Sequence, residues 1–114
     1  MTDLIARLEA LTEPSREVDA EIAVLVGGGA SKYAAGFEPH YTASIDAATT
    51  LVPEGWGRAI ADPQHWDDDP EDKTPYARLY PPDYRMKIGD DAIYKGDGSN
   101  MAIALCIAAL RARA

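Results

Sequence analysis

The chain has 114 residues, of which 46% are hydrophobic and 26% charged, a composition typical of one folded soluble domain rather than a disordered segment. Its formal net charge of −8 disfavours non-specific binding to nucleic acid or to anionic lipid, because both require a basic surface. The single cysteine, Cys106, excludes an intrachain disulfide and a thiolate zinc site.

The N-terminal stretch DLIARLEAL predicts an amphipathic helix, because its apolar residues recur at helical spacing. Pro14 cannot continue that helix, since its ring clashes with the preceding turn. Ser15 is then well placed to cap a second helix. The apolar face of the first helix consists of Leu4, Ile5, Leu8 and Leu11.

The second predicted helix, up to Val26, combines an apolar stripe with a polar face. Gly27 to Gly29 should end it, because glycine adopts a left-handed conformation there at little steric cost. An irregular loop is expected from Ala30 to His40. The stripe consists of Val18, Ile22, Leu25 and Val26, and the face expected to contact water consists of Arg16, Glu17, Asp19 and Glu21.

The stretch VLVGGGASKY is similar at first sight to a phosphate-binding loop. A P-loop has its lysine directly after the last glycine, followed by Ser or Thr, whereas Lys32 stands three residues after Gly29 and precedes Tyr33. A dinucleotide-binding loop would have glycine in place of Lys32 and would follow a strand. The C-terminal end of a helix also carries partial negative charge, so we interpret the stretch as a helix stop.

The stretch TASIDAATTLVPEGW predicts a third helix, capped by Thr42 or Ser44 and ended by Pro53 to Gly55. Its buried face should contain Ile45, Ala48 and Leu51. Three strands are predicted after it, in WGRAIA (56–61), YARLY (76–80) and YRMKI (84–88). Alternation places Trp56, Arg58 and Ile60 on one face of the first strand, and Tyr76, Arg78 and Tyr80 on one face of the second.

The last predicted helix begins near Ser99 or Asn100 and runs through Arg111. It is apolar nearly all round, so we expect it to be covered on most sides, and self-association could supply part of that cover. We therefore predict one α+β domain over residues 1–114, an α/β sandwich. It contains a small antiparallel sheet of about three strands, packed with N-terminal helices, a central helix and this apolar C-terminal helix.

Neither a secretory signal nor a membrane span is evident, because the start of the chain carries an early acid and the longest apolar run is about half the length of a span. A cytoplasmic protein is expected. His40 and His65 lack partners at catalytic or metal-type spacing, and Cys106 lies in an apolar helix. The acidic run Asp67 to Asp69 lacks the alternation of a calcium loop. We predict no catalytic residues, no metal site and no cofactor.

One set of tyrosine, arginine and lysine side chains in the strand region is a candidate ligand site. Such residues supply stacking and bidentate contacts, although an ordinary outward sheet face is the favoured explanation of the set. A planar or anionic ligand, if one binds, is expected there. The set consists of Arg58, Tyr76, Arg78, Tyr80, Arg85, Lys87, Tyr94 and Lys95.

Two stretches, YTASIDAATTLVPEGW (41–56) and MAIALCIAALRARA (101–114), resemble the phage ABA-sandwich domain proteins. These are small proteins of tailed phages and prophages, related in layout to the NinX-like phage proteins. The resemblance implies an α/β sandwich and a phage or prophage origin, and it supplies no catalytic residues.

Three functions are considered. The first is a non-enzymatic phage accessory protein that binds a host or phage protein in the host cytoplasm, and it suits the acidic composition. The second is a small-ligand binder, such as a sponge for a nucleotide signal of anti-phage defence. The third, an enzyme, would need a site built from residues such as His40 and His65. We favour the first, without direct nucleic-acid or membrane binding.

Overall fold

The chain forms four helices and a three-stranded sheet within residues 2–63, 74–82 and 93–113, which are those that the computed structural model describes. This arrangement confirms the predicted α+β class. The helices are α1 (Thr2–Ala10), α2 (Arg16–Val26), α3 (Ile45–Thr49) and α4 (Met101–Arg113), and the strands are β1 (Gly57–Ala61), β2 (Tyr76–Tyr80) and β3 (Tyr94–Asp97).

The sheet has the order β1-β2-β3, with both pairs antiparallel. Strands β1 and β2 lie where alternation predicted them. The strand predicted at 84–88 lies outside the described residues. The third strand observed, β3, was not predicted, because its four residues YKGD include glycine and aspartate, which strands disfavour.

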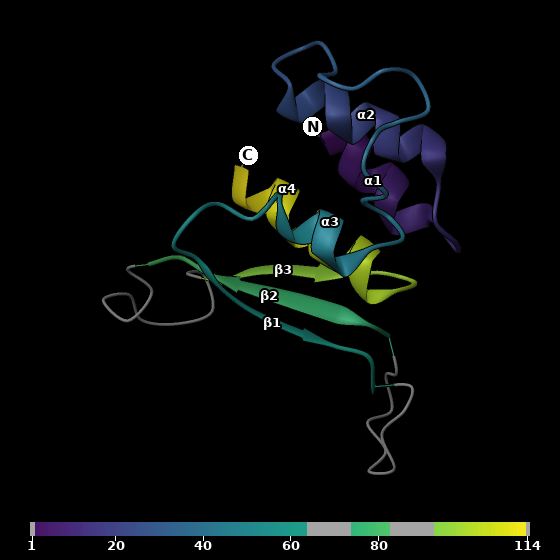
Figure 1. Ribbon diagram of the computed structural model, residues 1–114. Helices are drawn as coiled ribbons and strands as arrows, with labels where there is room; N and C mark the ends of the chain where they lie inside the picture. Colours follow the sequence, from purple (N-terminus) through teal and green to yellow (C-terminus); the bar gives the residue numbers. More distant parts are fainter. Residues whose placement is uncertain (1, 64–73, 83–92, 114) are drawn as a thin grey trace.

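Helix α4 lies across one face of the sheet, with α3 beside it and with α1 and α2 in a further layer (Figure 1). The close approach of α4 to β3 depends on glycine. A Cβ atom at Gly96 would lie 2.2 Å from the Ala104 carbonyl oxygen, and one at Gly98 would lie 2.7 Å from a side-chain carbon of Ile103. All the described helices lie on this side of the sheet, and none of them covers its opposite face (Figure 1).

The apolar helix α4 is covered within a single chain. Every residue from Ala102 to Leu110 is at most 3% exposed, and the core around them includes Leu8, Ile22 and Leu79. Helix α4 therefore gives no reason to expect self-association, and the oligomeric state stays a prediction. None of the helices in the described ranges is long and apolar enough to span a membrane.

Asp19 corrects one expectation from the helical pattern. It was expected to contact water, but it is 1% exposed. Its carboxylate accepts hydrogen bonds from the Thr42 backbone N–H at 2.8 Å and the Thr42 hydroxyl at 2.9 Å, and it pairs with Arg16 at 2.8 Å. The prediction was wrong because the partner that allows burial is 23 residues away in the sequence.

The same Thr42 links α2 to the start of α4. Asn100 donates its side-chain amide to the Thr42 carbonyl oxygen at 3.1 Å. Its Oδ1 accepts from the Ile103 N–H at 2.7 Å, which confirms that α4 begins near Ser99 or Asn100.

Helix α3 is capped by Ser44, whose hydroxyl accepts from the Ala47 N–H at 3.2 Å. Ala48 and Leu51 are buried as predicted, but Ile45 is 37% exposed, so its predicted burial was wrong. The helix has only five residues. Its C-terminal end continues into a turn with i→i+3 hydrogen bonds, such as the one from the Leu51 N–H to the Ala48 carbonyl oxygen at 3.0 Å. The buried face of α3 is therefore shorter than predicted, with Ala48 and Leu51 inside and Ile45 at the surface.

Candidate functional site

The sheet divides the predicted ligand-binding residues between its two faces. Tyr76, Arg78 and Tyr80 are half-buried on the face of β2 opposite Ala77 and Leu79, which are buried against the core. The predicted alternation in β2 is thus confirmed. The register places Lys95 opposite Arg78, on the same outward face.

Arg58 and Tyr94 belong to the other face, since both stand opposite Leu79 in the register. The Tyr94 ring packs at 5.5 Å from the ring of Trp56 as part of the structure around the core. Arg85 and Lys87 lie outside the described residues. The predicted set therefore does not converge on one site in the described parts of the chain.

Interactions within the sheet already occupy Arg78. Its guanidinium lies 4.7 Å above the Tyr76 ring, donates to the Ala77 carbonyl oxygen at 2.9 Å and lies 3.4 Å from the Asp97 carboxylate. This carboxylate offsets its charge, so the arrangement suits an ordinary outward sheet face better than an anion site.

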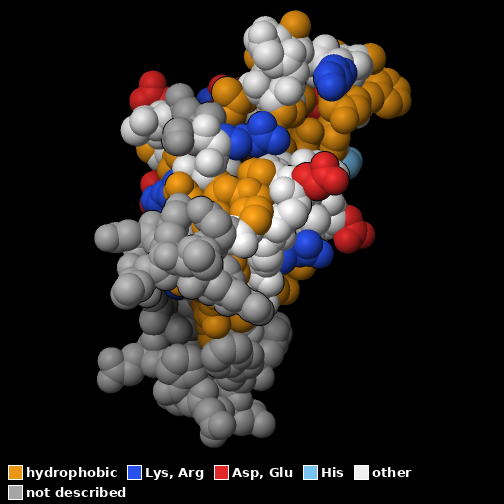
Figure 2. Space-filling view, turned by 90° about the vertical axis from the view of Figure 1, so that its left-hand side faces the viewer, with side chains coloured by type: hydrophobic (Ala, Val, Ile, Leu, Met, Phe, Trp, Pro, Cys, Tyr) orange, Lys and Arg blue, Asp and Glu red, His pale blue; other side chains and the backbone are white. Residues whose placement is uncertain are grey.

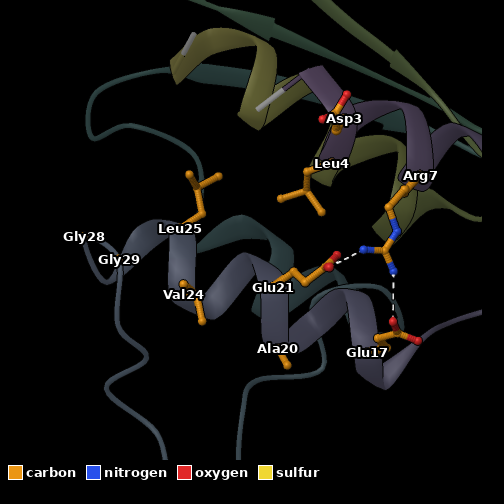
Figure 3. Close-up of a pocket in the computed structure, with 10 residues that line it drawn as sticks. All are labelled: Asp3, Leu4, Arg7, Glu17, Ala20, Glu21, Val24, Leu25, Gly28 and Gly29. Carbon is orange, nitrogen blue, oxygen red and sulfur yellow. Dashed lines mark hydrogen bonds and ion pairs between the residues drawn. The ribbon is translucent and has the colours of Figure 1, made fainter.

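A groove of about 780 Å³ lies between α1 and α2. Leu4 of α1 and Leu25 of α2 lie on its two sides (Figure 3). Val24 lines it as well and is 40% exposed. A volume of this size is within the range of ligand and peptide sites. The lining residues are Asp3, Leu4, Arg7, Glu17, Ala20, Glu21, Val24, Leu25, Gly28 and Gly29.

One end of the groove is ionic. Arg7 donates to the carboxylates of Glu21 and Glu17, and its second amino group lies 3.3 Å from Glu17 Oε1 (Figure 3). The hydrogen bond that Arg7 donates to the Glu21 carboxylate raises the pKa of Arg7 above its ordinary value. Oε2 of Glu21 is buried and has no hydrogen-bond partner among the described residues. With Asp3 included, the lining holds three carboxylates and one guanidinium, so it is acidic.

The other end of the groove is the glycine stretch that follows α2. Gly28 donates to the Leu25 oxygen at 3.2 Å and Gly29 to the Val24 oxygen at 3.0 Å, with positive φ of 77° and 109°. This pair of bonds is the Schellman motif, which confirms the predicted helix stop. The two N–H groups are already used, so they cannot cradle a phosphate as a P-loop does.

Apolar side chains also reach the surface elsewhere in the helical layers, between acidic and basic ones (Figure 2). Phe37 is 78% exposed on the predicted irregular loop. Arg16 braces that loop by donating to the Glu38 carbonyl oxygen at 2.8 Å and the Gly36 carbonyl oxygen at 3.3 Å. The aromatic ring therefore projects from a backbone that is held in place.

The sequence does not predict the groove, because the apolar pattern of α2 indicates only the stripe that is buried in the core. Val24 lies off that stripe, and an apolar residue at such a position is the one available signal. The facing residue Leu4 was assigned to the core, and it is indeed half-buried. The sequence of neither helix alone could predict the groove, because the groove depends on how α1 and α2 pack against each other.

The residues considered for catalysis show no constellation in the described ranges. Cys106 is buried, its thiol donates to the Tyr41 carbonyl oxygen at 3.2 Å, and burial raises its pKa far above the ordinary value. His40 is exposed, and His65 lies outside the described residues. No group of three or more His, Cys, Asp or Glu side chains that could hold a metal occurs in residues 2–63, 74–82 and 93–113.

No family model, curated protein or solved structure matches the chain.

Proposed function

We propose that the protein is a non-enzymatic binding protein whose α1/α2 groove docks a basic amphipathic helix of a partner protein. The observation that carries the proposal is the open apolar groove of about 780 Å³ with an acidic end. Helices commonly bind in this way, with the apolar face in a groove and charged residues along the rim.

The apolar part of the groove supports a helical partner. Leu4, Val24 and Leu25 all keep part of their surface exposed in the isolated chain. Covering that surface with apolar side chains of a partner is favourable, by about 25 cal/mol for each Å² removed from water. A ligand with apolar side chains one helical turn apart would contact both walls.

The polar part of the groove supports a basic partner. The lining carries three carboxylates against one guanidinium, and the chain as a whole has a charge of −8. Such a field attracts cations and speeds their association. The buried Glu21 Oε2 lacks a donor among the described residues, and a lysine or arginine of the partner would supply one.

The resemblance to phage ABA-sandwich proteins extends this proposal to origin and setting. A phage or prophage accessory protein would meet its partner, a host or phage protein, in the host cytoplasm. The residues that carry the resemblance have structural contacts here, as Thr42 does with Asp19 and Trp56 with Tyr94. A binding role for another surface is compatible with those contacts.

The test uses a labelled synthetic helix of leucine and lysine, with fluorescence anisotropy as the readout. We expect saturable binding that weakens as NaCl is added, because ion pairing contributes. Val24→Lys should reduce the affinity at least about tenfold, since it places a cation and a long side chain in the groove.

Ile45→Lys is the matched control, because Ile45 on α3 is 37% exposed and Val24 is 40% exposed. This variant should bind the peptide as the parent chain does. A leucine–glutamate helix should bind far more weakly. Equal binding of both peptides, or equal losses in the two variants, would show that the groove is not the docking site.

A further inference from the structure

A second hollow, of about 210 Å³, lies where the C-terminal ends of α2 and α4 meet the loop after α2. Its polar lining consists of Lys32, Tyr33, Tyr41, Thr50 and Arg113. We propose that this hollow binds a small oxyanion of the phosphate class. The proposal is independent of the α1/α2 groove and of the cations on the sheet.

The charges of the lining point to an anion. Lys32 and Arg113 are the only charged residues among the described residues that line it, in a chain of net charge −8. No hydrogen bond or ion pair joins Lys32 to any residue in the described ranges. Arg113 donates its Nε to the Leu51 carbonyl oxygen at 3.2 Å, which orients the guanidinium. Its terminal amino groups have no partner among the residues that the structure describes, so they can donate to a ligand.

The two helix ends oppose an anion, but they do so weakly. Each C-terminus carries roughly half a negative charge, so two of them offset about half of the two full positive charges present. The carbonyl oxygens of Val24 and Leu25 are also already bonded to the glycine N–H groups. The local balance therefore stays positive.

Besides the two cations, the tyrosine hydroxyls supply neutral hydrogen-bond donors to the hollow. Tyr41 is 2% exposed, and burial, together with the neighbouring Tyr33 hydroxyl, raises its pKa, so the phenol stays protonated at neutral pH. Recognition would thus come from side chains and not from the backbone of the glycine stretch. The volume of about 210 Å³ is below the range for drug-sized ligands, which favours a single phosphate group over a whole nucleotide.

The experiment is calorimetric titration of the full chain with inorganic phosphate at low ionic strength. We expect saturable binding, with acetate binding more weakly because it offers fewer acceptor oxygens. Lys32→Gln and Arg113→Gln should each weaken phosphate binding about tenfold, the usual size for loss of one charge-assisted contact. Tyr33→Phe should weaken it less.

Arg58→Gln is the control, since Arg58 is an exposed cation on β1 outside the hollow. The leucine–lysine helix should bind Lys32→Gln as it binds the parent chain, which separates a failure here from a failure of the groove. Lys32 is exposed, so Lys32→Gln should fold even if Arg113→Gln does not. Absence of saturable binding to folded protein, or binding that Lys32→Gln leaves intact, would overturn the proposal.

Discussion

The N-terminal part of the molecule and the α4–sheet part use their apolar residues differently. In α4, residues Ala102 to Leu110 are at most 3% exposed and contact the sheet, α3 and α1. In the N-terminal part, Val24 is 40% and Phe37 is 78% exposed. The α4–sheet part buries nearly all the apolar side chains of its helix, whereas the N-terminal part buries some, such as Leu8 and Ile22, and leaves others at the surface.

The largest expected effect is in the closely packed part. In Gly96→Ala, the new methyl group would meet backbone atoms of α4, with 2.2 Å to the Ala104 oxygen and 2.7 Å to the Ala108 nitrogen. Backbone cannot move aside cheaply, so we expect a loss of about 3 kcal/mol in the free energy of unfolding. Urea denaturation measures it.

Gly57→Ala is the control for that substitution, because a Cβ atom there would lie 3.7 Å from the nearest side-chain atom, an ordinary contact. It should change stability little. Equal effects of the two substitutions would mean that the approach of α4 to β3 does not limit stability.

The next effect concerns the polar link between the two parts. Thr42→Val removes the hydroxyl that donates to the buried Asp19 carboxylate, and we expect a loss of about 2 kcal/mol in stability. Thr49→Val is the comparison, because that hydroxyl bonds only to the Ile45 carbonyl oxygen of its own helix turn. Thermal unfolding of both variants should separate them by several degrees. A negligible loss in Thr42→Val would indicate that Asp19 finds another donor.

The smallest effect on stability is expected in the groove. Glu21→Gln should change the free energy of unfolding by at most about 0.5 kcal/mol, because its ion pair with Arg7 is partly exposed. The same variant should bind the leucine–lysine helix more weakly and with a smaller salt dependence, since one carboxylate is lost. A large loss of stability with unchanged peptide binding would place Glu21 among the structural residues.

Much of the local structure followed from patterns within a few residues. The sequence predicts Ser15 as a cap, Thr42 or Ser44 as the next cap, and the three glycines as a helix stop, because a cap depends on neighbours three or four residues away. Alternation in β2 similarly separated Tyr76, Arg78 and Tyr80 from the core. Strand β3 was not predicted, because it forms through pairing with β2 and its composition does not favour a strand.

The predictions about the site were less successful, because they depended on contacts between residues far apart in the sequence. Arg58 and Tyr94 were grouped with Arg78, but the register of the sheet turned them to the other face. The helical pattern predicts that Asp19 faces solvent, but in the structure its carboxylate is buried and accepts from the Thr42 N–H and hydroxyl. Lys32 and Arg113 are far apart in the chain and line one hollow only because the ends of α2 and α4 meet.

The sequence by itself determined the α+β class, the helix ends and the acidic charge, because helical and strand periods, caps and composition are local properties. Tertiary structure alone decided that α4 is covered within one chain, that the candidate cations are split between two faces and that a groove opens between α1 and α2. These features depend on contacts between elements that are far apart in the sequence. Such contacts require two surfaces to fit each other, and neither segment alone specifies that fit.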